Sequence, residues 1–265
     1  MKEGRMEILV CMKSVPDERG EIRLDPESRK MDLIRAEKKE NEFDAYALEL
    51  ALRTKENYGG SVTVVTVGSE EDCICIRNGL SLGAEEAFLI KGDQAGEKDP
   101  AALAQLLTEA LPELEKRRGK AFDLILTGRE STDYGSALLS GILAEKCKLP
   151  YLSSVIEIKM EGEELEIKKE LDEGYQLYAV RTPALLSVAK GEMEPRYPNI
   201  MKRLASRKAE IPEIEREQET EGSFCLEYLS IEEVGKKKKG IKIKEADSKK
   251  AVEEAIRQMR ADRVL

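Results

Sequence analysis

The 265-residue chain contains no histidine. Histidine is the commonest general base, a frequent metal ligand and the side chain whose ordinary pKa lies closest to neutrality. Its absence argues against a hydrolase triad and a histidine-based metal centre. Cysteine is also scarce, and the five cysteines show no Cys-X-X-Cys spacing: Cys11, Cys73, Cys75, Cys147 and Cys225. This odd set argues against a disulfide framework and a tetrahedral zinc site, so we expect reduced thiols.

Long apolar runs are missing as well. No stretch approaches the length needed to span a membrane, and residues 1–18 lack both a long apolar run and a small-residue cleavage site. We therefore expect a cytoplasmic protein. Acidic residues outnumber basic ones by 53 to 44, which gives a net charge of −9 and argues against a nucleic-acid-binding protein.

The first half of the chain alternates between strand and helix patterns. Apolar β-rich runs at residues 8–12, 62–67, 87–90 and 122–127 predict strands, and the segments between them predict helices at about 44–58, 70–82 and 100–116. We expect Asp44 to cap the first of these helices. Such alternation predicts an α/β fold with a doubly wound, mostly parallel sheet of the adenine-nucleotide-binding type.

The second half adds strands and then an arm. After a short helix at 137–146, we predict strands at 154–160, 165–171, 175–180 and 184–189, with antiparallel hairpin strands joined by a turn at Glu161-Gly162. We expect one α/β domain over residues 1–209 and an extended C-terminal arm over 210–265. The arm contains an acidic segment at 210–222 that we expect to lie outside the core, a strand at 224–229, a basic run at 236–239 and a helix from about 248. That helix has one apolar stripe, which packs either on a partner or back on its own sheet.

Ligands of an open parallel sheet bind beyond the carboxyl ends of its strands. The loop at residues 128–137 follows such an end and leads into a helix, with Arg129 as a charged fork and Ser131, Thr132 and Ser136 as hydroxyl donors. This loop suits a phosphate, although a loop of this composition more often only caps its helix. Asp99 precedes another helix and is expected to be its cap.

Two segments near the end of the sheet resemble the electron transfer flavoprotein β-subunit family. They are Pro-Ala-Leu-Leu-Ser-Val at 183–188 and Glu-Pro-Arg-Tyr-Pro at 194–198, where the family pattern has Pro-Ala-Leu-Leu-Thr-Val and Asn-Glu-Pro-Arg-Tyr-Pro. The Val-Pro-Asp at 15–17 and the Asn-Glu-Phe-Asp at 41–44 also match family landmarks. The chain departs from the pattern at Tyr134, Leu138 and Ser140, where the family has glycine, glutamine and glycine.

The resemblance implies a β-type subunit that works with an α-type subunit and FAD, and that moves electrons between a flavin-containing dehydrogenase and another redox partner. It implies an adenine nucleotide in this subunit, either AMP or a second FAD, and Val15-Pro16-Asp17 favours the FAD-holding group that performs electron bifurcation. The resemblance places the C-terminal arm on the α subunit. The implied cofactor-binding residues are Cys11, Lys13, Asn41, Glu42, Phe43, Asp44, Thr66, Val67, Gly68, Asp99, Gly128, Arg129, Glu130, Ser131, Thr132, Asp133, Tyr134, Gly135, Ser136, Ala137, Leu138, Leu139 and Ser140. The implied partner-recognition residues are Arg196, Tyr197, Ile200, Met201 and Leu204.

Two other functions fit the sequence. One is an adenine-nucleotide-binding regulatory protein of the universal-stress type, which has the same sheet architecture and works without an α subunit. The other is a scaffold subunit that has lost nucleotide binding, an alternative favoured by the substitutions at residues 134, 138 and 140. The turn at 194–198 and the helical arm favour the electron carrier, because a regulator without partners has no use for them.

Overall fold

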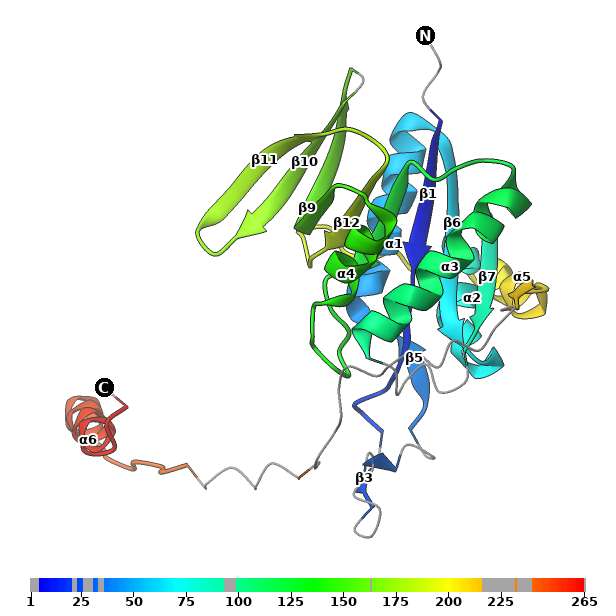
Figure 1. Ribbon diagram of the computed structural model, residues 1–265. Helices are drawn as coiled ribbons and strands as arrows, with labels where there is room; N and C mark the ends of the chain where they lie inside the picture. Colours follow the sequence, from blue (N-terminus) through cyan, green and yellow to red (C-terminus); the bar gives the residue numbers. More distant parts are fainter. Residues whose placement is uncertain are drawn as a thin grey trace.

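The computed structural model describes residues 5–20, 23–25, 31–32, 36–92, 99–162, 164–215, 232 and 240–264. Its centre is a parallel array of β1 (Met6–Cys11), β6 (Gly60–Gly68), β7 (Glu86–Lys91), β8 (Leu124–Gly128) and β12 (Ala184–Val188). These strands belong to a nine-stranded sheet (Figure 1). The predicted α/β fold with a mostly parallel sheet is confirmed.

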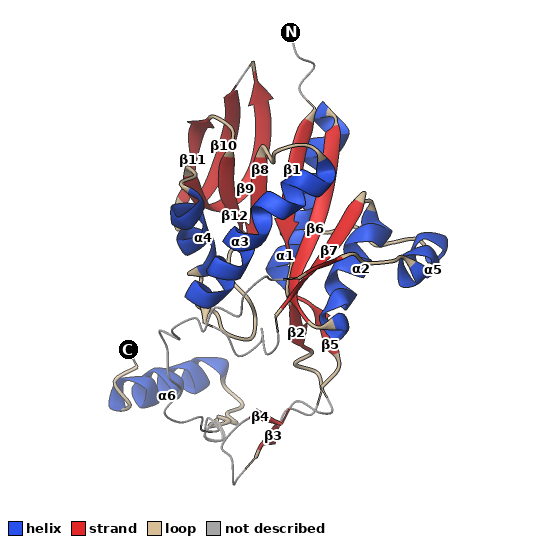
Figure 2. Cartoon of the chain, turned by 45° about the vertical axis from the view of Figure 1, so that its right-hand side comes forward, coloured by secondary structure: helices blue, strands red, loops and turns tan. Residues whose placement is uncertain are grey.

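Helices cover both faces of the sheet because its central strands are apolar on both sides. One face packs against α1 (Glu42–Tyr58) and α2 (Cys73–Leu82), with Ile8, Val10 and Leu126 in the same buried cluster. The other face packs against α3 (Pro100–Arg118) and α4 (Leu139–Cys147), with Leu9 and Ile125 in a second cluster. Figure 2 shows these helices on either side of the strands. Strands that are buried on both faces have continuous apolar sequences, as the apolar runs in the first half of the chain predicted.

Three further strands extend the sheet at one side. β9 (Tyr151–Glu161) runs parallel to β12, and β10 (Glu164–Leu171) and β11 (Gly174–Val180) follow as an antiparallel meander. The turn after Glu161 therefore forms the predicted hairpin. At the opposite edge, β13 (Glu213–Ile214) pairs with β7, and the Ile214 side chain is buried. The prediction that the acidic segment from residue 210 lies outside the core is wrong at Ile214, because that side chain belongs to the same buried cluster as Phe88 and Ile90 of β7.

Several predicted boundaries move for local reasons. The helix predicted from residue 70 begins as a 3-10 turn at Glu70–Asp72 before α2. The helix predicted from residue 137 begins at Leu139, because Ala137 has a φ of 53°, outside the helical region. The N-cap position of α1 is Asn41, so the prediction of Asp44 as its cap is wrong. Asp44 instead lies in the first turn, where its carboxylate accepts N–H groups from two other loops.

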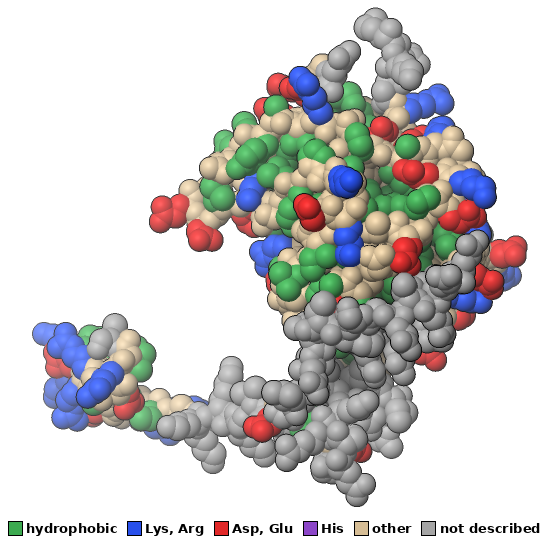
Figure 3. Space-filling model, in the orientation of Figure 1, with side chains coloured by type: hydrophobic (Ala, Val, Ile, Leu, Met, Phe, Trp, Pro, Cys, Tyr) green, Lys and Arg blue, Asp and Glu red, His purple; other side chains and the backbone are tan. Residues whose placement is uncertain are grey.

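The remaining elements lie outside this layered body. Short pairs are formed by β2 (Ser14–Pro16) with β5 (Lys38–Glu40) and by β3 (Arg23–Leu24) with β4 (Met31–Asp32). α5 (Ile200–Lys208) packs beside α2, and α6 (Ser248–Ala261) confirms the helix predicted from residue 248. No residue of α6 is buried, and Figure 1 shows it apart from the sheet. Figure 3 shows its basic and hydrophobic side chains gathered on different sides of the helix.

Some sequence predictions concern residues that are not described. These are the strand at 224–229, the basic run at 236–239 and Cys225. Within the described ranges, no helix is both long enough and apolar enough to cross a membrane. The same residues contain no cluster of cysteines and carboxylates arranged to hold a metal ion.

Candidate functional site

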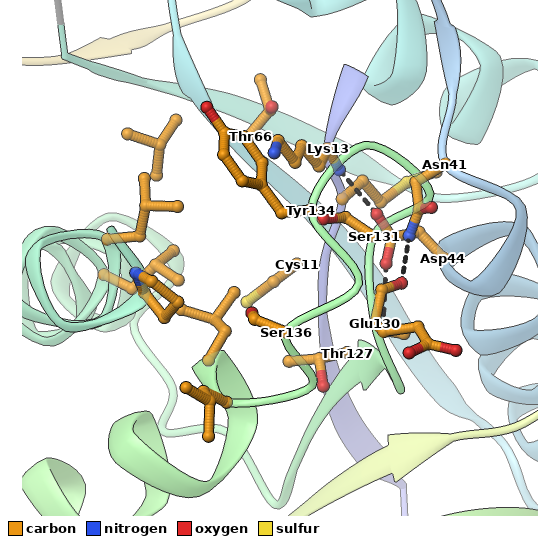
Figure 4. A pocket seen from close by; sticks show the side chains of 18 of the residues that line it. Cys11, Lys13, Asn41, Asp44, Thr66, Thr127, Glu130, Ser131, Tyr134 and Ser136 are labelled. Atoms are coloured by element: carbon orange, nitrogen blue, oxygen red, sulfur yellow. Dashed lines mark hydrogen bonds between the residues drawn. The ribbon is translucent and has the colours of Figure 1, made fainter. Parts of the chain in front are cut away.

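A cavity of about 300 Å³ lies at the carboxyl ends of β1, β6 and β8. Its walls come from the loops after these strands and from the first turns of α3 (Figure 4). This is the edge at which an open parallel sheet presents loop amides and helix N-termini to a ligand. The sequence predicted a site at this edge.

Asp44 ties two of these loops together. Its Oδ2 accepts the Lys13 N–H at 2.7 Å, and its Oδ1 accepts the Gly128 N–H at 3.0 Å. A Cβ atom at residue 128 would lie 2.4 Å from Asp44 Oδ1, so this position requires glycine. Burial raises the pKa of Asp44 to about 7, although the hydrogen bonds from the two amides and from Asn41 oppose that rise.

Asn41 adds a second link between the loops. Its Nδ2 donates to the Glu130 carbonyl at 2.8 Å, its Oδ1 accepts the Thr132 N–H at 3.1 Å, and its own N–H donates to the Lys13 carbonyl. Figure 4 shows both Asn41 and Asp44 beside the loop that carries Glu130 and Ser131. The start of α1 therefore fixes the position of the loop predicted to bind phosphate.

The N-terminus of α4 opens at this cavity without a side-chain cap. Leu138 occupies the N-cap position and its side chain cannot accept an N–H. Gly135 and Ala137 both have positive φ values just before it. The prediction that Ser and Thr side chains merely cap this helix is therefore wrong. A helix end without a cap presents backbone N–H groups and the positive end of the helix dipole, which together suit an anion.

Lys13 lines the cavity beside Tyr134 (Figure 4). Its Nζ lies 2.6 Å from Asp133 Oδ2 and 4.7 Å from the centre of the Tyr134 ring. Arg129 contacts Phe43 and Glu130. Its guanidinium lies 4.9 Å from the centre of the Phe43 ring and 2.6 Å from Glu130 Oε1. The side chain predicted as the phosphate fork is thus already held by an aromatic ring and a carboxylate.

The opposite wall of the cavity is apolar. Val65 and Val67 come from β6, and Pro100, Leu103 and Leu107 come from one face of α3. Asp99 caps α3 by accepting the Ala102 N–H at 2.8 Å, as the sequence predicted. Thr66 also lines the cavity, but its hydroxyl oxygen is closed off from solvent and lies beside the Cys75 thiol. Such an apolar wall is suited to a flat heterocycle.

Most of the predicted cofactor residues meet at this cavity. Those that line it are Cys11, Lys13, Asn41, Asp44, Thr66, Val67, Asp99, Gly128, Arg129, Glu130, Ser131, Tyr134, Ser136, Ala137, Leu138 and Leu139. The others lie beside it: Glu42, Phe43, Gly68, Thr132, Asp133, Gly135 and Ser140. Glu42, for example, pairs with Lys190, and Ser140 hydrogen-bonds Thr127 at 2.7 Å.

The α3 wall was not predicted from the sequence. Pro100, Leu103 and Leu107 recur at spacings of three and four residues, but apart from Asp99 before it, nothing at this helix was expected to contribute to the site. The signal that would have found them is the Asp99 cap, since a helix that starts at the carboxyl edge of the sheet faces the ligand with its first turns.

The fold and the cavity define a mostly parallel α/β protein with a ligand pocket at the carboxyl ends of its strands. The family model described as "Electron transfer flavoprotein domain" matches residues 31–219. The chain is 33% identical over 195 residues to the electron transfer flavoprotein subunit beta of Thermoanaerobacterium thermosaccharolyticum, which covers 74% of this chain and 72% of the relative. It is also 33% identical over 214 residues to the subunit of that name from Megasphaera elsdenii, covering 79% and 78%.

A third relative is the Caffeyl-CoA reductase-Etf complex subunit CarD of Acetobacterium woodii, 33% identical over 196 residues, 74% of this chain and 72% of the relative. The chain belongs to the electron transfer flavoprotein family, as a β-type subunit. The resemblance found in the sequence is confirmed.

Proposed function

We propose that this β-type subunit binds the adenylate part of a nucleotide cofactor in the cavity and works with an α-type subunit that holds FAD. Together they move electrons between a flavin-containing dehydrogenase and another redox partner, in the cytoplasm. The subunit name shared by the relatives supports the α-type partner. The same relatives favour the electron carrier over the regulator of the universal-stress type.

One observation supports the nucleotide most strongly: the uncapped start of α4 opens at one part of a cavity whose other wall is apolar. The residues fit an adenylate. The apolar side chains of β6 and α3 would bind the base, and the amides around Leu138 would bind a phosphate. Lys13 would add a positive charge beside that phosphate.

We propose FAD as the nucleotide, with AMP as the alternative. The Val-Pro-Asp segment that favours FAD contributes to β2, and Val15 is fully buried there. When bound, a flavin supplies the electron-transfer chemistry, and the protein supplies binding, orientation and exclusion of water. A second FAD would permit electron bifurcation, which we include in the proposal. The third relative, which is named as part of a caffeyl-CoA reductase complex, supports an assembly with a dehydrogenase.

The first test identifies the nucleotide. The chain is co-expressed with its α-type subunit, the visible spectrum of the purified complex is recorded, and the released nucleotides are separated by chromatography. Two FAD per αβ complex support bifurcation, and one FAD with one AMP supports simple transfer. One FAD without any second nucleotide contradicts binding in this cavity and leaves the scaffold alternative.

The substitution Leu138→Asp tests the phosphate position. A carboxylate at the N-cap stabilises α4 by about 1 kcal/mol while it repels a phosphate from the same amides. We therefore expect loss of the nucleotide of this subunit, together with a melting temperature of the nucleotide-free chain that is unchanged or raised relative to the nucleotide-free wild type. Leu138→Asn is the matched control, because it also caps the helix but adds no charge. Equal nucleotide content in the wild type and the Asp variant would contradict binding at α4.

A further inference from the structure

An aromatic ring lies at the edge of the nucleotide cavity, at a position where the family pattern has glycine. Tyr134 lines the cavity and is 40% exposed. The turn at residues 132–134 places it there, since the Gly135 N–H donates to the Ser131 carbonyl at 2.7 Å and closes the turn. A large ring that is partly exposed beside a cavity offers a surface that a ligand can cover.

Lys13 and Asp133 restrain this ring. The Lys13 ammonium lies over the ring, with Nζ 4.7 Å from its centre, and the same Nζ pairs with Asp133 Oδ2 at 2.6 Å. Both charged side chains are mostly buried. The backbone N–H of Lys13 is itself held by Asp44. A cation held in this way over the ring restricts the orientations that the ring can adopt, so little freedom remains to be lost on binding.

The side of the cavity across from the ring is apolar. α3 contributes Leu103 and Leu107 to it, and Figure 4 shows this helix and the Tyr134 ring on different sides of the cavity. An aromatic ring and an aliphatic wall across one cavity suit a flat heterocycle, because apolar atoms then cover both of its faces. The anion position at the start of α4 is next to Leu138, which also lines the cavity. The ring and the anion position can therefore contact one nucleotide.

We propose that Tyr134 stacks on the base of the bound nucleotide and holds it against the α3 wall. This inference rests on the proposed function, because it concerns the nucleotide of the same cavity. Stacking depends on the area of the base, and a purine offers a larger face than a pyrimidine. Tyr134 is therefore a specificity-determining residue that favours a purine. The change from glycine to tyrosine adds a contact to the site instead of removing the site.

The test measures binding of AMP to the αβ complex from which the nucleotide of this subunit has been removed. Isothermal titration calorimetry gives the Kd of the wild type and of each variant. Tyr134→Ala should raise the Kd for AMP about tenfold, as expected for the loss of one stack between a base and an aromatic ring. Tyr134→Phe should keep the wild-type Kd, because it retains the ring without the hydroxyl.

Ribose 5-phosphate separates stacking from a general effect on the cavity. It has the sugar and the phosphate of AMP without the base, and its binding is measured by competition with AMP. We expect the wild type and Tyr134→Ala to bind it equally. If Tyr134→Ala weakens ribose 5-phosphate by the same factor as AMP, Tyr134 only shapes the loop and the inference is wrong. CMP is the third probe: the wild type should prefer AMP to CMP, and Tyr134→Ala should reduce that preference.

Tyr197→Ala is the matched control, because Tyr197 is 94% exposed and belongs to a separate loop, the turn at 194–198. It should leave the Kd for AMP unchanged. If the wild type binds AMP and Tyr134→Ala binds it equally well, the stacking alone is overturned. A lower Kd in Tyr134→Ala would show that the ring blocks the cavity, which also overturns the stacking. Failure of the wild-type complex to bind either AMP or FAD in this subunit would overturn the proposed function as well.

Discussion

Two buried carboxylates on α1 position the rim of the cavity and the turn before α5, and they do so under different electrostatic conditions. Asp44 fixes the rim of the cavity and accepts hydrogen bonds from backbone amides. Glu49, five residues later, fixes the turn at 194–198 and accepts hydrogen bonds from the guanidinium groups of Arg196 and Arg53. Neither carboxylate is more than 5% exposed.

The partners decide the charge of each carboxylate. Burial raises the pKa of Asp44 to about 7, because two amide dipoles only partly offset the loss of hydration. Burial also opposes ionisation of Glu49, but hydrogen bonds from Arg196 and Arg53 outweigh it and lower the pKa of Glu49 below its ordinary value. The rim of the cavity is therefore held by Asp44, which titrates near neutrality. The turn at 194–198 is held by Glu49, which stays ionised. Both carboxylates hold a loop in place. The charge of the amide-bound one changes near neutral pH, whereas that of the arginine-bound one does not, so the two contribute differently to the pH dependence of stability.

Removing the Asp44 carboxylate at the rim of the cavity should have the largest effect on the unfolding free energy and on the nucleotide content. Asp44→Ala leaves the buried N–H groups of Lys13 and Gly128 without their acceptor, which costs about 3 kcal/mol of unfolding free energy. The loops would separate, so the complex should also lose the nucleotide of this subunit. Urea denaturation and nucleotide content measure the two effects.

The control for this change is Asp99→Ala at the other wall of the cavity. It removes a helix cap, so it should cost about 1 kcal/mol. Equal losses in the two variants would show that Asp44 is an ordinary first-turn carboxylate and does not tie the loops.

Removing the link between the turn at 194–198 and α1 should have an intermediate effect on the unfolding free energy. Arg196→Ala leaves the buried carboxylate of Glu49 with Arg53 as its one guanidinium partner in the described structure, beside the N–H of residue 196, and we expect a loss of about 2 kcal/mol of unfolding free energy. The matched control is Arg53→Ala, which removes the other guanidinium of Glu49 without touching the turn. Because Arg53 is 49% exposed by side chain, the control should cost less than 1 kcal/mol. A larger loss in the control would contradict the role of Arg196 as the anchor.

The sequence predicted the layers and most of the cavity, because both depend on local patterns. Continuous apolar strands and the polar loop at 128–137 are visible without any knowledge of tertiary contacts. The role of Asp44 was not visible in the sequence, because its two partners lie 31 and 84 residues away in the chain. The direction of Arg196 was missed for the same reason, since its acceptor Glu49 is 147 residues away. The prolines at 195 and 198 stiffen the backbone around Arg196, but the surface that its side chain faces is a long-range property.

The pH dependence of stability should show the smallest effect and separates the two carboxylates directly. The pKa of Asp44 is raised in the folded protein from 3.8 to about 7, so the folded state binds a proton that the unfolded state releases. Its contribution is fully present below pH 3.8 and is lost as the pH rises through about 7. Between pH 8 and pH 6 the wild type should therefore gain about 1.4 kcal/mol of unfolding free energy from this group.

Because the chain has no histidine, few other groups titrate in this window. Urea denaturation at pH 6, 7 and 8 measures the gain. Asp44→Asn should be destabilised at each pH but should lack most of the slope, because an amide takes up no proton. Glu49→Gln should keep the wild-type slope, since the lowered pKa of Glu49 lies far below pH 6. If unfolding free energy still changes with pH between 6 and 8 in Asp44→Asn, another group takes up the proton. The carboxylates of the rim and of the turn at 194–198 would then not differ in charge near neutral pH.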